Sequence, residues 1–83
     1  MKISAELSLY PLSANYKTAI SEYIASLKKH TALEVRVNAL STEVFGDYDS
    51  VMQAIQSTTK AVFEHNNGTV LVAKFLNRDR SQA

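Results

Sequence analysis

The sequence predicts an α+β fold in which a four-stranded antiparallel sheet carries two helices on one face. Apolar residues alternate with period two in four segments and recur at helical spacing in two others. These segments follow one another in the order strand, helix, strand, strand, helix, strand, and the two middle strands are close enough to pair as a hairpin. Two strand–helix–strand halves with right-handed crossovers, joined by a hairpin, form the ferredoxin-like split β-α-β arrangement.

A change of period near Pro11 separates the first strand from the first helix. Residues 3–10 alternate, with Leu7 and Leu9 on one side. The other side carries a polar row made of Glu6, Ser8 and Tyr10. We expect Pro11 to end the strand and its hydrogen-bond ladder, because proline has no backbone N–H. Residues 13–30 then change to helical spacing, with an apolar stripe formed by Tyr16, Ala19, Ile20, Tyr23, Ile24 and Leu27.

The middle of the chain predicts a hairpin followed by the second helix. Segments 33–37 and 40–46 alternate on either side of a tight turn. The turn sequence after the second segment contains Asp47 and Asp49, either of which can cap the next helix. The buried stripe of that helix is expected to comprise Val51, Met52, Ile55, Thr58, Thr59 and Val62.

The end of the chain predicts one more strand and a tail. Residues 66–68, Asn-Asn-Gly, supply the left-handed backbone that stops the second helix. Residues 69–76 form the last strand, and we expect the polar residues after it to fray. A single ferredoxin-like domain is therefore predicted over residues 1–77, with a polar C-terminal tail over 78–83.

Composition and charge favour a soluble, cytoplasmic domain. Of the 83 residues, 46% are hydrophobic and 20% are charged, which is typical of a globular protein. Nine basic and eight acidic residues leave a net charge of +1, scattered along the chain, so we expect no nucleic-acid partner. The chain has no cysteine, no signal-peptide pattern and no apolar run of the about 20 residues that a membrane span needs.

The sequence carries no catalytic or metal-binding pattern. His30 and His65 lie near the ends of different predicted helices, without an acidic neighbour at metal-ligand spacing. The only glycines, Gly46 and Gly68, exclude the glycine-rich phosphate loops. The first strand also lacks the basic and aromatic cluster of RNA-recognition modules. We therefore predict no enzyme, no cofactor and no metal site.

The last strand predicts self-association, because it is apolar on both faces. One row contains Val70, Val72 and Leu76, and the other contains Leu71, Ala73 and Phe75, with Lys74 as the charged exception. The preceding strand also places a large apolar residue on each face, Val44 on one and Phe45 on the other. Soluble monomers usually avoid exposing such patches. We expect a homodimer or homotetramer that forms through sheet faces or edge strands.

Two motifs at the strand ends point to a family. The stretch SLYPL ends the first strand, and LSTEVFGDYDSV carries Ser41-Thr42, Gly46, Asp49 and Val51 into the second helix. Both resemble the small thiamine-binding family of the YkoF type, and the likeness extends over residues 3–76 in the same element order. The resemblance implies a ferredoxin-like domain that assembles into dimers or tetramers. It also implies a pocket for thiamine, or its hydroxymethylpyrimidine half, beside the first strand and the Ser-Thr strand.

The residues near these motifs suit such a ligand. Hydroxyl and backbone groups pair with the amine and ring nitrogens of an aminopyrimidine, an aromatic face attracts the thiazolium cation, and a carboxylate balances its charge. The candidate ligand-binding residues are Glu6, Ser8, Leu9, Tyr10, Ser41, Thr42, Glu43 and Phe45. Each has a structural alternative: Tyr10 packs under a turn, Thr42 is a good strand former, Phe45 packs in an interface, and the two glutamates pair with Arg36 or Lys74.

Two functions follow from these observations. The first is a non-catalytic binding protein for thiamine or its hydroxymethylpyrimidine moiety, which acts as a homo-oligomer. The alternative is a structural or regulatory protein-interaction domain that oligomerises through its open sheet face. The first function requires a polar pocket beside the first strand, and the second requires a closed, dry sheet face.

Overall fold

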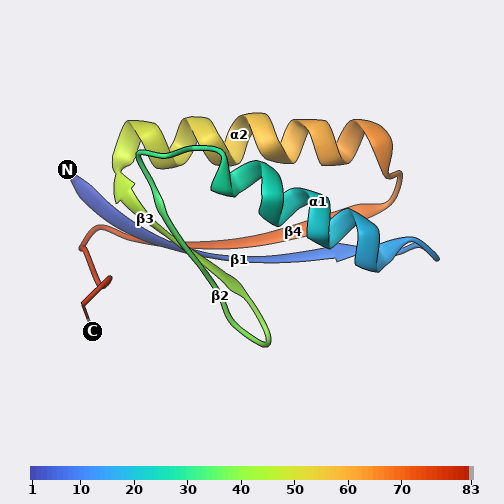
Figure 1. Ribbon diagram of the computed structural model, residues 1–83, viewed down its shortest axis with the longest axis horizontal. Coiled ribbons are helices and arrows are strands. Elements are labelled where there is room, and N and C mark those ends of the chain that lie inside the picture. The colour runs from blue at the N-terminus through green and yellow to red at the C-terminus, as the bar shows by residue number, and fades with distance from the viewer. Residues whose placement is uncertain (83) are drawn as a thin grey trace.

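The computed structural model, in which residues 1–82 are described, has the predicted element order and the predicted ferredoxin-like α+β fold (Figure 1). Both helices lie on one face of the sheet, and the other face is left open. The elements are β1 (Lys2–Pro11), α1 (Tyr16–Lys28), β2 (Glu34–Val37), β3 (Thr42–Asp47), α2 (Tyr48–His65) and β4 (Thr69–Leu76).

The sheet is fully antiparallel, with the strand order β2-β3-β1-β4. Since β1 is central, its alternation decides what each face carries. Ile3, Ala5 and Leu7 point to the helices and are at most 3% exposed. The polar row predicted from the sequence, which contains Glu6, Ser8 and Tyr10, therefore lies on the open face.

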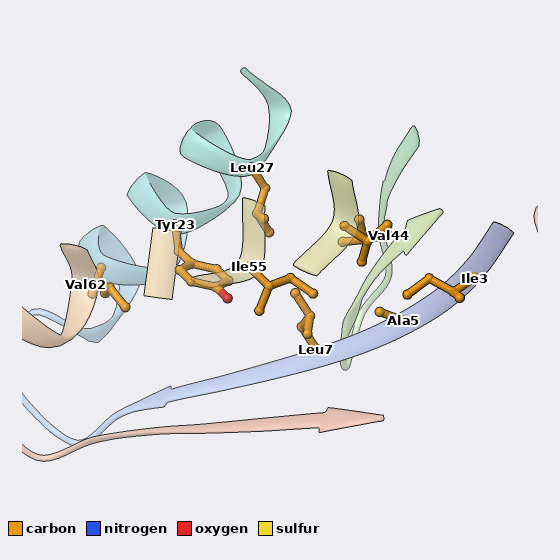
Figure 2. Close-up of a cluster of buried hydrophobic side chains, with 10 residues drawn as sticks. Ile3, Ala5, Leu7, Tyr23, Leu27, Val44, Ile55 and Val62 are labelled. Carbon is orange, nitrogen blue, oxygen red and sulfur yellow. The ribbon is translucent and has the colours of Figure 1, made fainter. Parts of the chain in front are cut away.

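The core lies between the helices and the central strands. Figure 2 shows side chains of both helices directed at β1 and β3. The core residues are Ile3, Ala5, Leu7, Ala19, Tyr23, Leu27, Val44, Val51, Ile55 and Val62. Tyr23 is 3% exposed, and its hydroxyl lies 2.9 Å from the Thr59 hydroxyl, which joins α1 to α2. This hydrogen bond offsets the cost of burying the phenol.

The helix stripes differ from the predicted ones at their margins. Tyr16, predicted to be buried, is 47% exposed, because it is the first residue of α1 and lies beyond the sheet-facing stripe. Ala54, which was not predicted, is completely buried, because a small side chain lets α2 approach its neighbours closely. Asp47 is the N-cap residue of α2, but its side chain makes no capping hydrogen bond. Instead the Tyr48 N–H donates to the Met1 carbonyl at 2.8 Å.

The two glycines, Gly46 and Gly68, occupy positions that favour glycine for different structural reasons. A Cβ on Gly46 would lie 2.8 Å from the Leu33 Cδ2, so any other residue here requires this leucine side chain to shift. Gly68 has a φ of 77°, the left-handed backbone that glycine tolerates. Asn66 is extended, and no non-glycine residue among those described has a positive φ, so the prediction of several left-handed residues was wrong for the asparagines.

Residues 77–82 turn back over the open face instead of fraying (Figure 1). The Ser4 hydroxyl donates to the Arg78 carbonyl at 2.7 Å and accepts from the Arg80 N–H at 2.9 Å. Arg36 donates to the Ser81 carbonyl. A hydroxyl and a guanidinium on the open face thus hold the main chain of the tail, which the polar composition alone did not indicate.

Candidate functional site

A pocket opens beside the end of β1, where this strand continues beyond its pairing with β3. Pairing between β1 and β3 ends at Leu7 and Thr42, whereas pairing between β1 and β4 continues to Pro11 and Thr69. As predicted, β1 and its ladder with β4 end at Pro11, but on the β3 side the ladder stops four residues earlier, at Leu7. The gap beside residues 8–10 is bounded by the β2–β3 hairpin and by α1.

This gap, named here the hairpin pocket, has a volume of about 180 Å³. Its walls are mainly apolar and its polar groups are few, which is typical of small-molecule sites. It is lined by Leu7, Ser8, Leu9, Tyr10, Ile20, Tyr23, Ile24, Val37, Asn38, Ala39, Leu40, Ser41 and Thr42. Five of the candidate residues from the sequence therefore share one cavity.

The hydroxyls that line the hairpin pocket differ in the hydrogen bonds they make. Ser41 donates to the Glu6 carboxylate at 3.0 Å, and Ser8 makes only a long contact of 3.4 Å with the Leu40 carbonyl. Thr42 is 8% exposed, and among the described residues its hydroxyl has no side-chain hydrogen bond. A hydroxyl both donates and accepts hydrogen bonds, and Thr42 lines the pocket, so its hydroxyl is suited to bind a polar atom placed there.

A row of charges crosses the open face beside the pocket. The strand register sets Arg36, Glu43, Glu6 and Lys74 next to one another, in the order plus, minus, minus, plus. Lys74 lies 2.7 Å from the Glu6 carboxylate. The hydrogen bond from Lys74, followed by the one from Ser41, holds the pKa of Glu6 below its usual range. Arg36 pairs with Glu34, so among the described residues Glu43 is left without an ion pair.

The remaining candidates line a second, shallower groove on the open face. This groove, of about 420 Å³, contains Glu6, Glu43 and Phe45. Phe45 is only 5% exposed, because the Arg36 guanidinium lies 4.9 Å from its ring centroid and the tail passes beside it. Tyr10, by contrast, is 50% exposed at the mouth of the hairpin pocket. Of the two aromatic candidates, only Tyr10 presents a face to a ligand.

Sequence reasoning missed the helical wall of the pocket. Ile20, Tyr23 and Ile24 of α1 were assigned to the core stripe, which is correct for Tyr23, but all three also line the cavity. Asn38 and Ala39 were predicted only as a turn and Leu40 only as the start of the next strand, and none of them was predicted to line a site. In the structure β3 begins at Thr42, so Leu40 lies in the turn, where it is 90% exposed.

Other kinds of site find no support among residues 1–82. No group of three or more histidine, aspartate or glutamate side chains in this range is placed to hold a metal ion. Neither helix of this range is long and apolar enough to cross a membrane.

Comparison with known proteins identifies the family. A family model described as "Thiamine-binding protein" matches residues 5–82. The chain belongs to this family. The resemblance inferred from the two sequence motifs is thereby confirmed. The match includes every residue that lines the hairpin pocket.

Solved structures share the fold of this thiamine-binding family member. A protein of Streptococcus pneumoniae has a TM-score of 0.87 at 20% identity, covering 96% of this chain and 90% of its own. A hypothetical protein of Methanocaldococcus jannascii has a TM-score of 0.81 at 28% identity, covering 96% and 84%. A candidate thiamine biosynthesis/salvage protein of Thermotoga maritima has a TM-score of 0.84 at 14% identity, covering 94% and 85%. No curated protein matches the sequence.

Proposed function

We propose that this chain is a non-catalytic binding protein that holds the aminopyrimidine half of thiamine in the hairpin pocket. The observation that carries the proposal is a cavity lined by the Ser8, Ser41 and Thr42 side chains and by apolar walls, in a member of the thiamine-binding family. A hydroxyl both donates and accepts, so it suits an edge that presents an amine next to a ring nitrogen. Ser8 and Ser41 lie on the same cavity and supply further hydroxyls.

The size of the pocket favours one ring over the whole molecule. Sites for drug-sized ligands measure roughly 300–1,000 Å³, whereas the hairpin pocket measures about 180 Å³. The pyrimidine ring therefore lies inside, between Leu9 and the α1 side chains, and the thiazolium lies at the mouth. There the exposed ring of Tyr10 attracts the cation by about 0.5–1 kcal/mol. Glu6 accepts a hydrogen bond from Ser41, which lines the pocket, so its carboxylate lies beside the proposed site.

The protein is proposed to act as a homo-oligomer. The support is the exposed apolar surface of β4, where Val70, Val72, Phe75 and Leu76 are each 45–49% exposed. This surface also favours the second candidate function, a structural or regulatory interaction domain without a ligand. The two candidates differ in whether the hairpin pocket is used.

Titration calorimetry with thiamine and with hydroxymethylpyrimidine tests the binding function. Both compounds should bind, because both carry the ring that fits the pocket, and the thiazole half alone should not. Thr42→Val keeps the shape of the side chain and removes its hydroxyl, so affinity should fall by about 1–3 kcal/mol. Thr58→Val is the matched control, because Thr58 is 5% exposed between the helices and outside the pocket. It should leave affinity unchanged.

Two results would contradict the proposal. Absence of heat with both pyrimidine compounds at millimolar concentration would leave only the interaction domain. Equal affinities in the wild type and in Thr42→Val would remove Thr42 from the site. Melting curves of both variants confirm that each is folded before its affinity is compared.

A further inference from the structure

The tail, residues 77–82, crosses the open face of the sheet from β1 to β2. Ser4 of β1 holds one part of the tail, and Arg36 of β2 holds the next part. β3 lies between these two strands, and its Phe45 pairs with Ser4 in the β1–β3 ladder. The tail therefore passes over Phe45, on the side of the sheet away from the helices (Figure 1).

Within residues 1–82, the hydrogen bonds from the sheet to the tail use only main-chain atoms of the tail. The Ser4 hydroxyl donates to the Arg78 carbonyl at 2.7 Å and accepts from the Arg80 N–H at 2.9 Å. Arg36 donates to the Ser81 carbonyl. Every peptide carries carbonyl and N–H groups of this kind, whatever its side chains. These contacts are therefore those of a peptide-binding site, and they do not depend on the side chains of the tail.

The tail is held weakly. None of its six residues, Asn-Arg-Asp-Arg-Ser-Gln, has an apolar side chain to bury against the sheet. In the described chain three hydrogen bonds join it to the sheet. The net gain from one such bond is similar to the entropy cost of fixing one backbone residue, so the two nearly cancel over the tail. A ligand that binds only the open state can then displace the tail at little cost.

The groove under the tail offers an apolar surface that the tail does not use. Phe45 is 5% exposed and lies on the same groove, of about 420 Å³, as Arg80 and Leu76. Leu76 is 45% exposed, so this surface remains partly in contact with water. The tail places the side chain of Arg80 here, where an apolar side chain would remove more apolar surface from water. The groove therefore favours a peptide with an apolar residue at this position over the tail itself.

We propose that Ser4, Arg36 and Phe45 form a binding site for a short peptide segment of a partner protein, and that the tail is a strap which occupies this site until the segment displaces it. The partner segment has an apolar residue at the position of Arg80, and its main chain takes over the hydrogen bonds of the tail. The inference goes beyond the proposed ligand function, because the groove under the tail and the hairpin pocket have no lining residue in common.

An NMR titration of the full chain with two synthetic peptides tests the binding site. Both peptides have the sequence of residues 77–82 with blocked ends, and one of them carries Arg80→Leu. We expect the Arg80→Leu peptide to shift the amide signals of Ser4, Arg36 and Phe45 and to bind at least about threefold more tightly than the unmodified peptide. Equal affinities of the two peptides, or no shift of these signals with either, would overturn the proposal.

Two variants of the full chain separate the strap from the site. Arg80→Pro removes the N–H that donates to Ser4 and leaves the Ser4 hydroxyl in place. The tail should become mobile by ¹⁵N relaxation, and the Arg80→Leu peptide should bind at least about threefold more tightly, because the open state is more populated. Ser4→Ala also frees the tail but removes the hydroxyl of the site, so the peptide should bind more weakly than to the wild type.

Ser13→Ala is the matched control, because it removes an exposed hydroxyl from the loop before α1. It should change neither the mobility of the tail nor the affinity for the peptide. Melting curves confirm that each variant is folded. Tighter peptide binding in Ser4→Ala would exclude Ser4 from the site, and a tail that stays rigid in this variant would contradict the strap.

Dilution shows whether the tail and its site belong to the same chain. Binding within one chain does not depend on protein concentration, so the relaxation of the tail should be the same after about tenfold dilution. A tail that loses its order on dilution would be supplied by another molecule, which would overturn the strap. Calorimetry with thiamine on Ser4→Ala is independent of these results, because Ser4 does not line the hairpin pocket. Failure of the peptide site and failure of the ligand site are therefore read separately.

Discussion

The two faces of β1 show how one strand serves stability and recognition at once. On the helix side, Ile3, Ala5 and Leu7 are at most 3% exposed and pack against both helices. On the open side, Glu6 and Ser8 are partly exposed; Glu6 pairs with the Lys74 side chain, and Ser8 donates to the Leu40 carbonyl. The helix side determines whether the chain folds, and the open side and the free end of the strand determine what it can bind. Substitutions on the two sides should therefore differ in kind as well as in size.

Leu7→Ala should have the largest effect. Leu7 is 2% exposed at the centre of the core, and removing its side chain leaves a cavity among well-packed neighbours. The free energy of unfolding should fall by about 2–5 kcal/mol, measured by urea denaturation. Leu12→Ala is the control, because Leu12 is 72% exposed and should change stability little. Similar losses in both variants would mean that the helix side is not the main source of stability.

Gly46→Ala should have the next largest effect. The added Cβ would lie 2.8 Å from the Leu33 Cδ2, so the leucine must move and the packing under it is disturbed. We expect a loss of about 1–3 kcal/mol in the free energy of unfolding. The double variant with Leu33→Ala supplies the control: if the clash is the cause, the glycine substitution should cost less in that background. An equal cost in both backgrounds would assign the effect to the backbone.

Tyr23→Phe should cost less, because it removes one hydrogen bond and keeps the ring. The Thr59 hydroxyl loses its partner at 2.9 Å, so the free energy of unfolding should fall by about 0.5–1.5 kcal/mol. Tyr16→Phe, in which the ring is 47% exposed, should not change stability. The effect should be visible as a lower urea midpoint with an unchanged slope. No difference between the two variants would show that the bond between the helices contributes nothing.

Lys74→Met should act on the open side without weakening the core. The largest cause of the lowered pKa of Glu6 is the hydrogen bond from Lys74, so this pKa should rise in the variant, while the bond from Ser41 remains. A lowered pKa in the folded state adds stability above the unfolded value of about 4.3, and this stability is lost as pH falls through the folded pKa. The variant should therefore lose less stability on acidification. An NMR titration of the Glu6 carboxyl checks the shift, with Lys17→Met as the control that should not change it.

The sequence predicted the fold well because the fold depends on local periods. Alternation over residues 3–10 and 69–76, and helical spacing between them, follow from which side chains must leave water. The same patterns placed Glu6, Ser8 and Tyr10 on the open face. The predictions that failed concern contacts between distant segments: Tyr16 lies outside the stripe that touches the sheet, and the tail is held by Ser4 and Arg36, which no local pattern links to it.

The sequence treated as one site a set of residues that the structure divides between two cavities. Five of the eight candidate residues line the hairpin pocket, but the sequence grouped them with Glu6, Glu43 and Phe45, which line a separate groove. The division arises because β3 stops pairing with β1 at Thr42, a register that depends on the length of the hairpin and not on any one residue.

By itself, the sequence determined the element order, the buried row of each central strand and the family, because these depend on side-chain period and short motifs. Only the tertiary structure decided which side chains and strand edges are accessible to a ligand or a partner. The strand register exposed the end of β1 and opened a pocket beside Thr42, placed Lys74 on Glu6, and left the whole length of β4 at the edge of the sheet. Those features arise where segments far apart in the chain meet or fail to meet, and that is set by packing and hydrogen bonding over the whole fold.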